Sequence, residues 1–310
     1  MVYLEKFVLP DEEKEYEIAR RRRIENGGSG DFGYLENGYP CALFGPKELS
    51  ELDFETVTIL YGGNGSGKST LLNLIGERLG LARSAPCNRS ELFTPFAMAC
   101  RVRAGLDEEG DPLPIPEKSA VITSDDVFEY MLALRAFNAE VADNLEEGKR
   151  DYAALKFGSN IRFTGMDDYE DFRLQVLSRR KSVSRRKFLQ QTAGREVPPG
   201  SNGETAVEYF ETHLQNDTLY CLDEPENSLS PRTQQALLSV LERKSRYCGC
   251  QLILATHSPF FLAMTGAKIY DLDARPVRPR KWWELENPRV FFEFFYAHRD
   301  LFLKGGEEES

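Results

Sequence analysis

The sequence predicts an α/β fold with a mostly parallel central sheet, and three observations carry this prediction. Apolar runs typical of strands alternate with helical segments through the last third of the chain. Val57–Tyr61, VTILY, is a run of β-branched and apolar residues typical of a buried strand. A glycine-rich loop then joins this strand to a helical segment. This order of strand, loop and helix sets the frame for the remaining elements.

Composition bounds the type of protein. The chain has 310 residues, 41% of them hydrophobic, which is enough for one large domain or two modest ones. We expect a single domain covering residues 1–310. With 39 Lys+Arg against 50 Asp+Glu, the formal net charge is −11. A surface this acidic cannot coat nucleic acid, so any contact with DNA or RNA requires a local patch.

The chain carries no signal for a membrane or for export. Its apolar stretches, such as the one at 291–296, are interrupted well before the ~18 residues that a spanning helix needs. The N-terminus MVYLEKFVLPDEEKE is acidic where a secretory signal is basic. The six cysteines form no CxxC pair, which argues against structural zinc and against a disulfide scaffold. We expect a cytoplasmic protein with no membrane contact.

Along the chain, a β-rich opening extends to about Tyr61 and a helix is expected from Lys68 to about Leu79. The proline-containing stretch 83–117 is interpreted as short strands and loops. Residues 125–200 are expected to form a helical insertion, which ends at Pro198-Pro199-Gly200 before a new helix near residue 203. The remaining strands and helix are expected at 120–122, 218–222, 231–243, 251–255 and 268–272.

The strand 57–61 runs directly into GGNGSGKST, which matches the pattern GxxxxGK[ST]. Glycines let the backbone turn tightly, so that N–H groups point at phosphate oxygens, and the following helix adds its positive N-terminal end. We expect Lys68 to reach the β- and γ-phosphates and Ser69 to hold Mg²⁺; a glycine-rich turn without a ligand is the alternative. The predicted ATP-binding residues are Gly62, Gly63, Asn64, Gly65, Ser66, Gly67, Lys68, Ser69 and Thr70.

A second strand, Thr218–Leu222, is followed by the acidic pair Asp223 and Glu224. Phosphoryl transfer needs one carboxylate in the magnesium shell and another that orients the attacking water. We assign Asp223 to the metal and Glu224 to the water, with Lys68 as a further catalytic residue. An acidic pair alone is more typical of a solvated surface, but the preceding apolar strand favours the catalytic interpretation.

A third apolar strand ends at Thr256, His257 and Ser258. A histidine at a strand end is more often structural than catalytic. Because open α/β sheets bind their ligands at the carboxyl ends of the strands, we predict that His257 contacts the γ-phosphate.

Together these motifs resemble those of the ATP-binding-cassette ATPase heads, a group of P-loop NTPases. The string GSNGE, Gly200 to Glu204, resembles the signature loop of that family in a variant form without the double glycine. A plain helix cap is the alternative for this string. The resemblance implies a head-to-tail homodimer or higher oligomer around two ATP molecules, in which Ser201 and Gly203 complete the partner's site and residues 227–230 cross the dimer seam.

Within this family, DEPENSLSP followed by ATHSP is more similar to the soluble RecF, OLD and SMC-like heads than to transporter subunits, and the Septu antiphage ATPase is a relative by the same criteria. This implies a link to antiphage defence or genome maintenance through a separate effector protein. The motor subunit of a membrane transporter and a nucleotide-sensing scaffold with slow turnover are the alternatives.

Two features depart from the family pattern. The family usually places a glutamine after the strand equivalent to 120–124, whereas this chain has Ser124, Asp125 and Asp126. Asp126 is our candidate for a further metal ligand beside Ser69 and Asp223, with helix capping as the alternative. The residue that stacks on adenine is also undecided among Tyr34, Tyr39 and Phe44.

Two basic clusters, Arg20–Arg23 and Arg179–Lys187, match no motif of the family. The first could neutralise transition-state charge, and the second could contact nucleic acid or an acidic partner. A solvated surface is the alternative for both.

Overall fold

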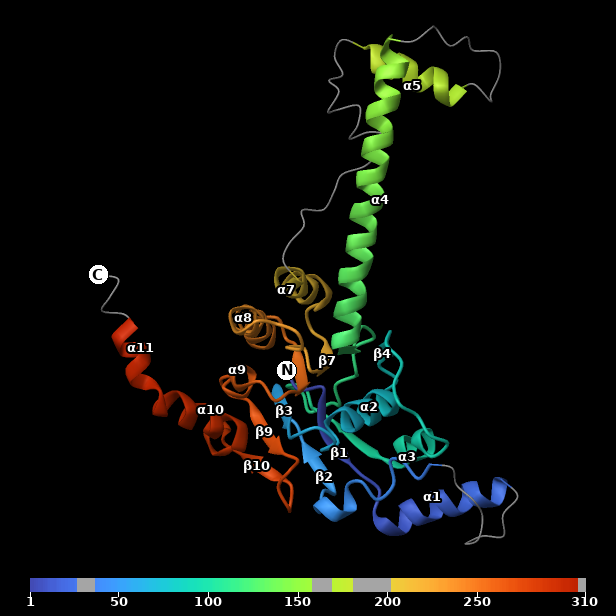
Figure 1. Cartoon of the computed structure of the whole chain (residues 1–310). Helices are drawn as coiled ribbons and strands as arrows, with labels where there is room; N and C mark the ends of the chain where they lie inside the picture. The colour runs from blue at the N-terminus through green and yellow to red at the C-terminus, as the bar shows by residue number, and fades with distance from the viewer. Residues whose placement is uncertain (27–36, 158–168, 181–201, 306–310) are drawn as a thin grey trace. The chain divides into compact units, whose positions relative to one another are not determined.

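The computed structural model describes residues 1–26, 37–157, 169–180 and 202–305 (Figure 1). The chain divides into two compact units. The first comprises Met1–Val127 and Gly203–Ser310, and the second comprises Phe128–Asn202, close to the bounds 125–200 expected for the helical insertion.

The first unit is built on a seven-stranded sheet with the strand order β10-β9-β3-β8-β7-β6-β4. Five of the six neighbouring pairs are parallel, and only β10 and β9 are antiparallel. The predicted α/β class with a mostly parallel sheet is therefore confirmed. The strands are β3 (Val57–Tyr61), β4 (Ala82–Arg83), β6 (Ala120–Thr123), β7 (Leu219–Asp223), β8 (Gln251–Ala255), β9 (Lys268–Asp271) and β10 (Arg278–Arg280).

The register of the parallel strands brings their carboxyl ends to one edge of the sheet. Ala255 at the end of β8 pairs with Leu60 of β3 on one side and with Asp223 of β7 on the other. Thr123 at the end of β6 also pairs with Asp223. The loops that leave β3, β6, β7 and β8 therefore start beside one another.

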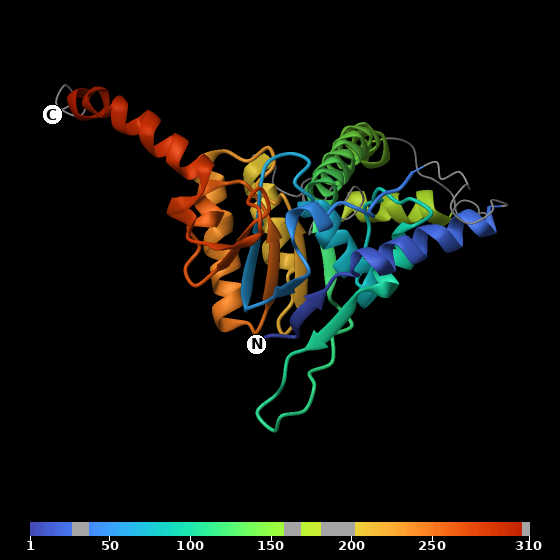
Figure 2. The same ribbon diagram turned by 90° about the horizontal axis from the view of Figure 1, so that it is seen from below.

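Helices cover the sheet, and Figure 2 shows α2 and α8 on opposite sides of the strands. These helices are α2 (Lys68–Leu79), α7 (Asn202–His213), α8 (Pro231–Tyr247) and the short α9 (Pro259–Leu262). The central strands β3 and β8 are buried along their whole length, which matches their mostly apolar sequences. Rigid packing of this kind holds the strand ends in fixed positions.

The N-terminal part differs from the expected β-rich opening. Three strands, β1 (Leu4–Val8), β2 (Glu51–Asp53) and β5 (Arg101–Ala104), form a separate antiparallel sheet. Between β1 and the short helix η2 (Gly45–Lys47), however, lies the 14-residue helix α1 (Glu12–Glu25). This helix was not expected, although β1, β2 and β3 are the strands of a β-rich opening. The Asp11 side chain accepts a hydrogen bond from the N–H of Lys14, and acids in the first turn and arginines in the last complement the helix dipole.

The stretch 83–117 also contains a helix that the sequence pattern did not indicate. Helix α3 (Phe93–Ala99) buries Phe93, Phe96 and Ala97. Pro95 lies in its first turn, where no backbone donor is needed. The helix was not predicted, because prolines are typical of loops and short strands were the other elements expected in this stretch.

The second unit consists of most of α4 (Ser124–Phe157) and of α5 (Tyr169–Arg179). Tyr152 is buried against Leu155, Leu174 and Leu177. The Gln175 amide and the Arg179 guanidinium both donate to the Leu155 carbonyl oxygen, at 3.3 and 3.1 Å. These contacts join the two helices.

After β10, the chain continues through η4 (Trp282–Glu284) into α10 (Glu286–Ala297) and α11 (Arg299–Gly305). Both views show these two helices running away from the strands (Figures 1 and 2). Within the described residues, we find no helix with both the length and the apolar character needed to cross a membrane.

Candidate functional site: a phosphate-binding loop beside two carboxylates

The glycine-rich loop lies between β3 and α2, as the sequence predicts. Gly67 caps the N-terminus of α2 with φ +101°, a conformation that favours glycine. A Cβ atom at this position would lie 3.1 Å from the buried ring of Phe44. The loop is also held from outside, because the Lys47 ammonium donates to the Ser66 carbonyl oxygen at 2.8 Å and the N–H of Gly63 donates to Asp273 at 2.7 Å. The structure thus contains a tight turn that ends at a helix N-terminus, the geometry that binds phosphate.

Lys68 is enclosed by this loop. Its side chain is only 5% exposed, and its ammonium donates to the carbonyl oxygens of Gly62 and Gly63 at 2.7 and 3.1 Å. The same nitrogen lies 3.7 Å from Oε1 of Glu224. A buried ammonium with two neutral partners and one distant carboxylate is well placed to bind an anion.

Ser69 and Asp223 meet across the sheet edge, although they are 154 positions apart in sequence. The Ser69 hydroxyl donates to Oδ1 of Asp223 at 3.0 Å. Burial raises the pKa of Asp223 to about 6, against the partial compensation from the Ser69 hydrogen bond. A hydroxyl beside a carboxylate is the oxygen donor set that Mg²⁺ prefers, and a cation would offset the cost of burying this charge. The residues present therefore fit the metal that the sequence predicts.

Glu224 projects toward the same place. Its φ of +47° is unusual for a residue other than glycine, and its N–H donates to the carbonyl oxygen of Ala255 at 2.9 Å. Nδ1 of His257 lies 3.7 Å from Oε1 of Glu224. The carboxylate thus lies between the Lys68 ammonium and the imidazole, with its side chain 30% exposed and accessible to water.

A further residue, Glu226, was not identified from the sequence. It is 5% exposed, and its Oε1 atom accepts hydrogen bonds from the Thr256 hydroxyl and from the N–H groups of His257 and Ser258, the latter two at 3.2 and 3.3 Å. Burial raises the pKa of this carboxyl group. Its second oxygen is buried and has no hydrogen-bond partner among the residues that the structure describes. Glu226 therefore fixes the backbone that carries His257. The only signal in the sequence is a second acid two residues after Glu224.

Asp126 is placed differently from a metal ligand. One carboxylate oxygen accepts from the N–H of Ala85 at 3.1 Å, and the other accepts from the N–H and the hydroxyl of Thr123 at 2.7 and 2.8 Å. The side chain is 7% exposed and lies in the first turn of α4. These contacts favour the capping alternative, and a metal-binding role for Asp126 stays a prediction.

The expected signature loop is described only in part. Ser201 lies outside the described residues, whereas Gly203 lies in the first turn of α7. A Cβ atom on Gly203 would lie 2.6 Å from the Thr233 hydroxyl of α8, so a glycine is required for this approach of the two helices. Between Glu226 and α8, Asn227 and Ser228 are exposed, and their contact with a partner stays a prediction.

Of the candidates for stacking on a base, Phe44 is excluded by its burial, since only 1% of it is exposed. Tyr39 is partly buried, stacks on Phe93 and donates a hydrogen bond to the Thr70 hydroxyl at 3.0 Å. Tyr34 lies outside the described residues. No described residue is therefore assigned to stack on the adenine base.

The basic clusters are also only partly described. In α1, Arg22 forms ion pairs with Glu25 and Glu91 at 2.9 and 3.1 Å. In the second cluster, positions 181–187 lie outside the described residues. Neither cluster is thereby assigned to a ligand.

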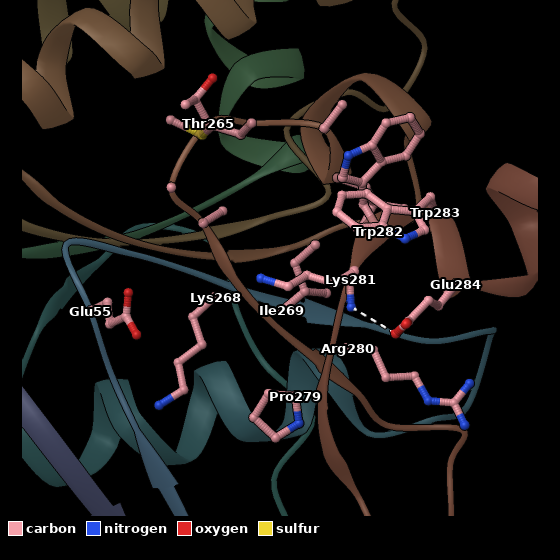
Figure 3. A pocket seen from close by; sticks show the side chains of 15 residues that line it. Glu55, Thr265, Lys268, Ile269, Pro279, Arg280, Lys281, Trp282, Trp283 and Glu284 are labelled. Atoms are coloured by element: carbon pink, nitrogen blue, oxygen red, sulfur yellow. Dashed lines mark hydrogen bonds between the residues drawn. The ribbon is translucent and has the colours of Figure 1, made fainter.

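A cavity of about 670 Å³ lies away from the loop, between the 262–269 segment and β10 (Figure 3). Figure 3 shows Trp282 and Trp283 together on one side of it and Lys268 on the other. No residue of the glycine-rich loop, Asp223, Glu224 or His257 lines this cavity. It is therefore separate from the candidate site.

Comparison with known proteins gives one partial family match. Residues 197–263 match a family described as "AAA domain, putative AbiEii toxin, Type IV TA system". This region includes Glu224, Glu226 and His257 but not the glycine-rich loop. No curated protein matches the chain.

Solved ATP-binding cassettes resemble the chain at a low level. The cassette MJ0796, solved as a dimer in a post-hydrolysis state with ADP and Pi, is 16% identical over 75% of this chain and 88% of its own, with a TM-score of 0.34. A nucleotide-free ATP-binding cassette from an ABC transporter is 16% identical over 76% of this chain and 85% of its own, with a TM-score of 0.37. The assignment of the site therefore rests on its own geometry.

Proposed function

We propose that the protein is an ATPase of the ATP-binding-cassette type, which binds and hydrolyses Mg-ATP at composite sites of a head-to-tail dimer. One observation carries this proposal: Lys68, Ser69, Asp223, Glu224 and His257 come from three separate chain segments and meet at one sheet edge. A glycine-rich turn alone could be structural. A turn whose ammonium and hydroxyl lie beside two carboxylates from another segment supports phosphoryl transfer.

Each residue has a defined task in this proposal. The N–H groups of residues 62–70 bind the phosphate oxygens, and the Lys68 ammonium moves from the loop carbonyls to the β- and γ-phosphates. Ser69 and Asp223 would hold Mg²⁺, which would neutralise charge that develops on the phosphates. Glu224 orients the attacking water, and His257, held by Glu226, contacts the terminal phosphate from the other side.

The second half of the site comes from another copy of the chain. Ser201 and Gly203 would supply a hydroxyl and N–H groups to the partner's γ-phosphate, and Gly203 lies in the first turn of α7, where a helix N-terminus can bind phosphate. The exposed loop 227–230 lies at the seam. ATP binding therefore closes the ATP-binding heads of the two copies on each other, and hydrolysis lets the heads separate.

Mixed complexes of two variants test the composite site. Ser201→Arg keeps its own phosphate-binding loop but blocks the contact it makes in its partner's site, and Lys68→Ala has the opposite defect. We expect both variants to be inactive alone and to regain ATP turnover when they are co-expressed, because the mixed dimer contains one intact site. A Ser201→Arg variant that is active alone, or mixed complexes without turnover, would contradict the proposal.

The ATP cycle acts on a separate effector protein in this proposal, with antiphage defence or genome maintenance as the process. The partial match to a family whose description names a toxin–antitoxin system supports an arrangement with a separate partner protein. Affinity capture of the Glu224→Gln variant in the presence of ATP, from cells that express the neighbouring genes, tests it. A stoichiometric effector is expected, and recovery of the ATPase alone would contradict it.

A further inference from the structure

The most unusual surface of the described chain is its aromatic C-terminal segment. Six large apolar side chains of α10 are 47–66% exposed: Val290, Phe291, Phe292, Phe294, Phe295 and Tyr296. In α11, Leu301, Phe302 and Leu303 are 65–69% exposed. We call these nine side chains the aromatic surface.

The positions of the charged residues on α10 show how much of the helix circumference is apolar. At roughly 100° per residue, its charged residues Glu286, Arg289 and Glu293 fall within an arc of about 60°. The six apolar side chains occupy most of the remaining circumference. A helix that is apolar on nearly all sides is normally buried.

The area is also too large for an ordinary free surface. An aromatic side chain has roughly 150–250 Å² of surface, and about half of it is exposed here, so the nine side chains together expose on the order of 800 Å². The largest apolar patch of a typical monomer is about 300–600 Å². About 800 Å² per partner is what a stable protein–protein interface buries.

The position of the aromatic surface indicates which partner binds it. Val290 and Phe291 line a cavity of about 400 Å³ together with Glu226, His257 and Ser258. The N–H of Asn287 also donates to the Tyr61 hydroxyl of β3 at 3.1 Å, which ties the first turn of α10 to the strand that enters the glycine-rich loop. The surface thus begins at the sheet edge that carries the candidate site, and this edge is the one that a second copy must approach.

The segment before α10 extends the apolar surface. Trp282 and Trp283 are 38% and 57% exposed, and their rings meet edge to face with centroids 6.0 Å apart (Figure 3). Leu285, directly after them, is fully buried and anchors the segment to the first unit. The aromatic surface is therefore presented from a fixed base.

We propose that the aromatic surface is an interface between two copies of this chain that forms without nucleotide and places the two heads near each other. This inference rests on the proposed function only for its choice of a second copy as the partner. Because the same helix lines the cavity beside His257, pairing of the surfaces also positions α10 against the candidate site.

Sedimentation velocity without nucleotide tests the inference on the full chain. We expect the wild type to be a dimer and the double variant Phe292→Glu/Phe295→Glu to be a monomer, since buried charge at both positions opposes pairing. Tyr247→Glu is the matched control, because Tyr247 is 81% exposed at the end of α8 and its substitution leaves the dimer intact. A monomeric wild type, which would point to another protein as the partner, or a dimeric double variant overturns the inference.

Hydrogen–deuterium exchange of the wild type provides a second test that needs no substitution. Amides of residues 290–303 are expected to exchange more slowly at concentrations where the dimer is populated and faster on dilution. Exchange that does not change with concentration overturns the inference. The outcome is independent of ATP turnover, so failure of the composite ATP site leaves this result intact, and the double variant is still expected to bind ATP.

Discussion

The hydroxyl of Thr256 donates a hydrogen bond to the carboxylate of Glu226, which joins the end of β8 to the loop that follows β7. The same carboxylate oxygen accepts two backbone N–H groups, those of His257 and Ser258. Because Glu224 lies two residues before Glu226, this contact couples the residue that we propose orients water to the backbone of His257. The relative position of Glu224 and His257 thus depends on one buried carboxyl group, that of Glu226.

Replacement of Glu226 tests this positioning role. Glu226→Ala leaves buried donors without an acceptor and is expected to lower the free energy of unfolding by at least about 2 kcal/mol. The kcat for ATP should fall roughly tenfold or more, through misplacement of His257. Glu226→Gln retains an acceptor oxygen and should recover most of both losses. Chemical denaturation and steady-state kinetics measure the two effects.

The exposed Glu108→Ala variant is the control for loss of a carboxylate, and it should change neither quantity. If Glu226→Ala loses stability but keeps the wild-type kcat, Glu226 is only structural. Recovery by the glutamine variant separates the loss of a hydrogen-bond acceptor from the loss of a charge.

Lys68 is expected to contribute to ATP affinity rather than to folding. Charge-assisted hydrogen bonds contribute about 1.5–3 kcal/mol, so Lys68→Ala should weaken ATP binding roughly 10- to 100-fold. Isothermal titration with ATP measures this change, and Lys14→Ala, an exposed lysine paired with Glu17, is the control. Unchanged affinity in Lys68→Ala would contradict the assignment of the loop.

Metal binding should depend on pH because of Asp223. Its pKa is raised to about 6 by burial, and Mg²⁺ needs the ionised carboxylate. The affinity for Mg²⁺ in the presence of ATP should therefore be constant above about pH 7 and fall about tenfold per unit below about pH 6. Asp223→Asn should bind Mg²⁺ weakly and without this dependence. A wild-type affinity that is flat from pH 5 to pH 8 would contradict the assignment.

The same raised pKa also affects the stability of the metal-free protein. The free energy of unfolding changes with pH in the opposite direction to the change that a salt-bridged acid causes. The pKa of an ordinary aspartate is about 4, and that of Asp223 in the folded protein is about 6. At pH values between these two, the native state binds more protons than the unfolded state. The contribution of Asp223 to the free energy of unfolding therefore falls as the pH rises through this window. Comparison of wild type and Asp223→Asn by denaturation at several pH values checks it.

Local signals in the sequence were sufficient for the central part of the fold. The strand Val57–Tyr61, the helix Lys68–Leu79 and the strand Gln251–Ala255 have the predicted bounds. Each is defined by a mostly apolar run or by glycines at its ends. The order of these strands in the sheet, in contrast, comes from pairing between distant segments.

Other features depend on contacts that no local pattern contains. The helix α1 has no apolar stripe, and it is held by its cap and by Glu15, which accepts a hydrogen bond from the N–H of Ala42 at 2.6 Å. Phe44 could be proposed to stack on a base because its burial is not visible in the sequence. In the sequence, Glu226 resembles an ordinary acidic loop residue. Its hydrogen bond with Thr256, 30 positions later, exists only in the folded structure.

The central claim is that Glu224 orients the water that hydrolyses ATP bound by the glycine-rich loop. Its most direct test is the rate of phosphate release by Glu224→Gln, with ATP affinity measured on the same sample. We expect the rate to fall at least about 100-fold, since general-base catalysis contributes roughly 10²- to 10⁴-fold, while the affinity stays within about twofold of wild type. Phosphate release at the wild-type rate would contradict the account.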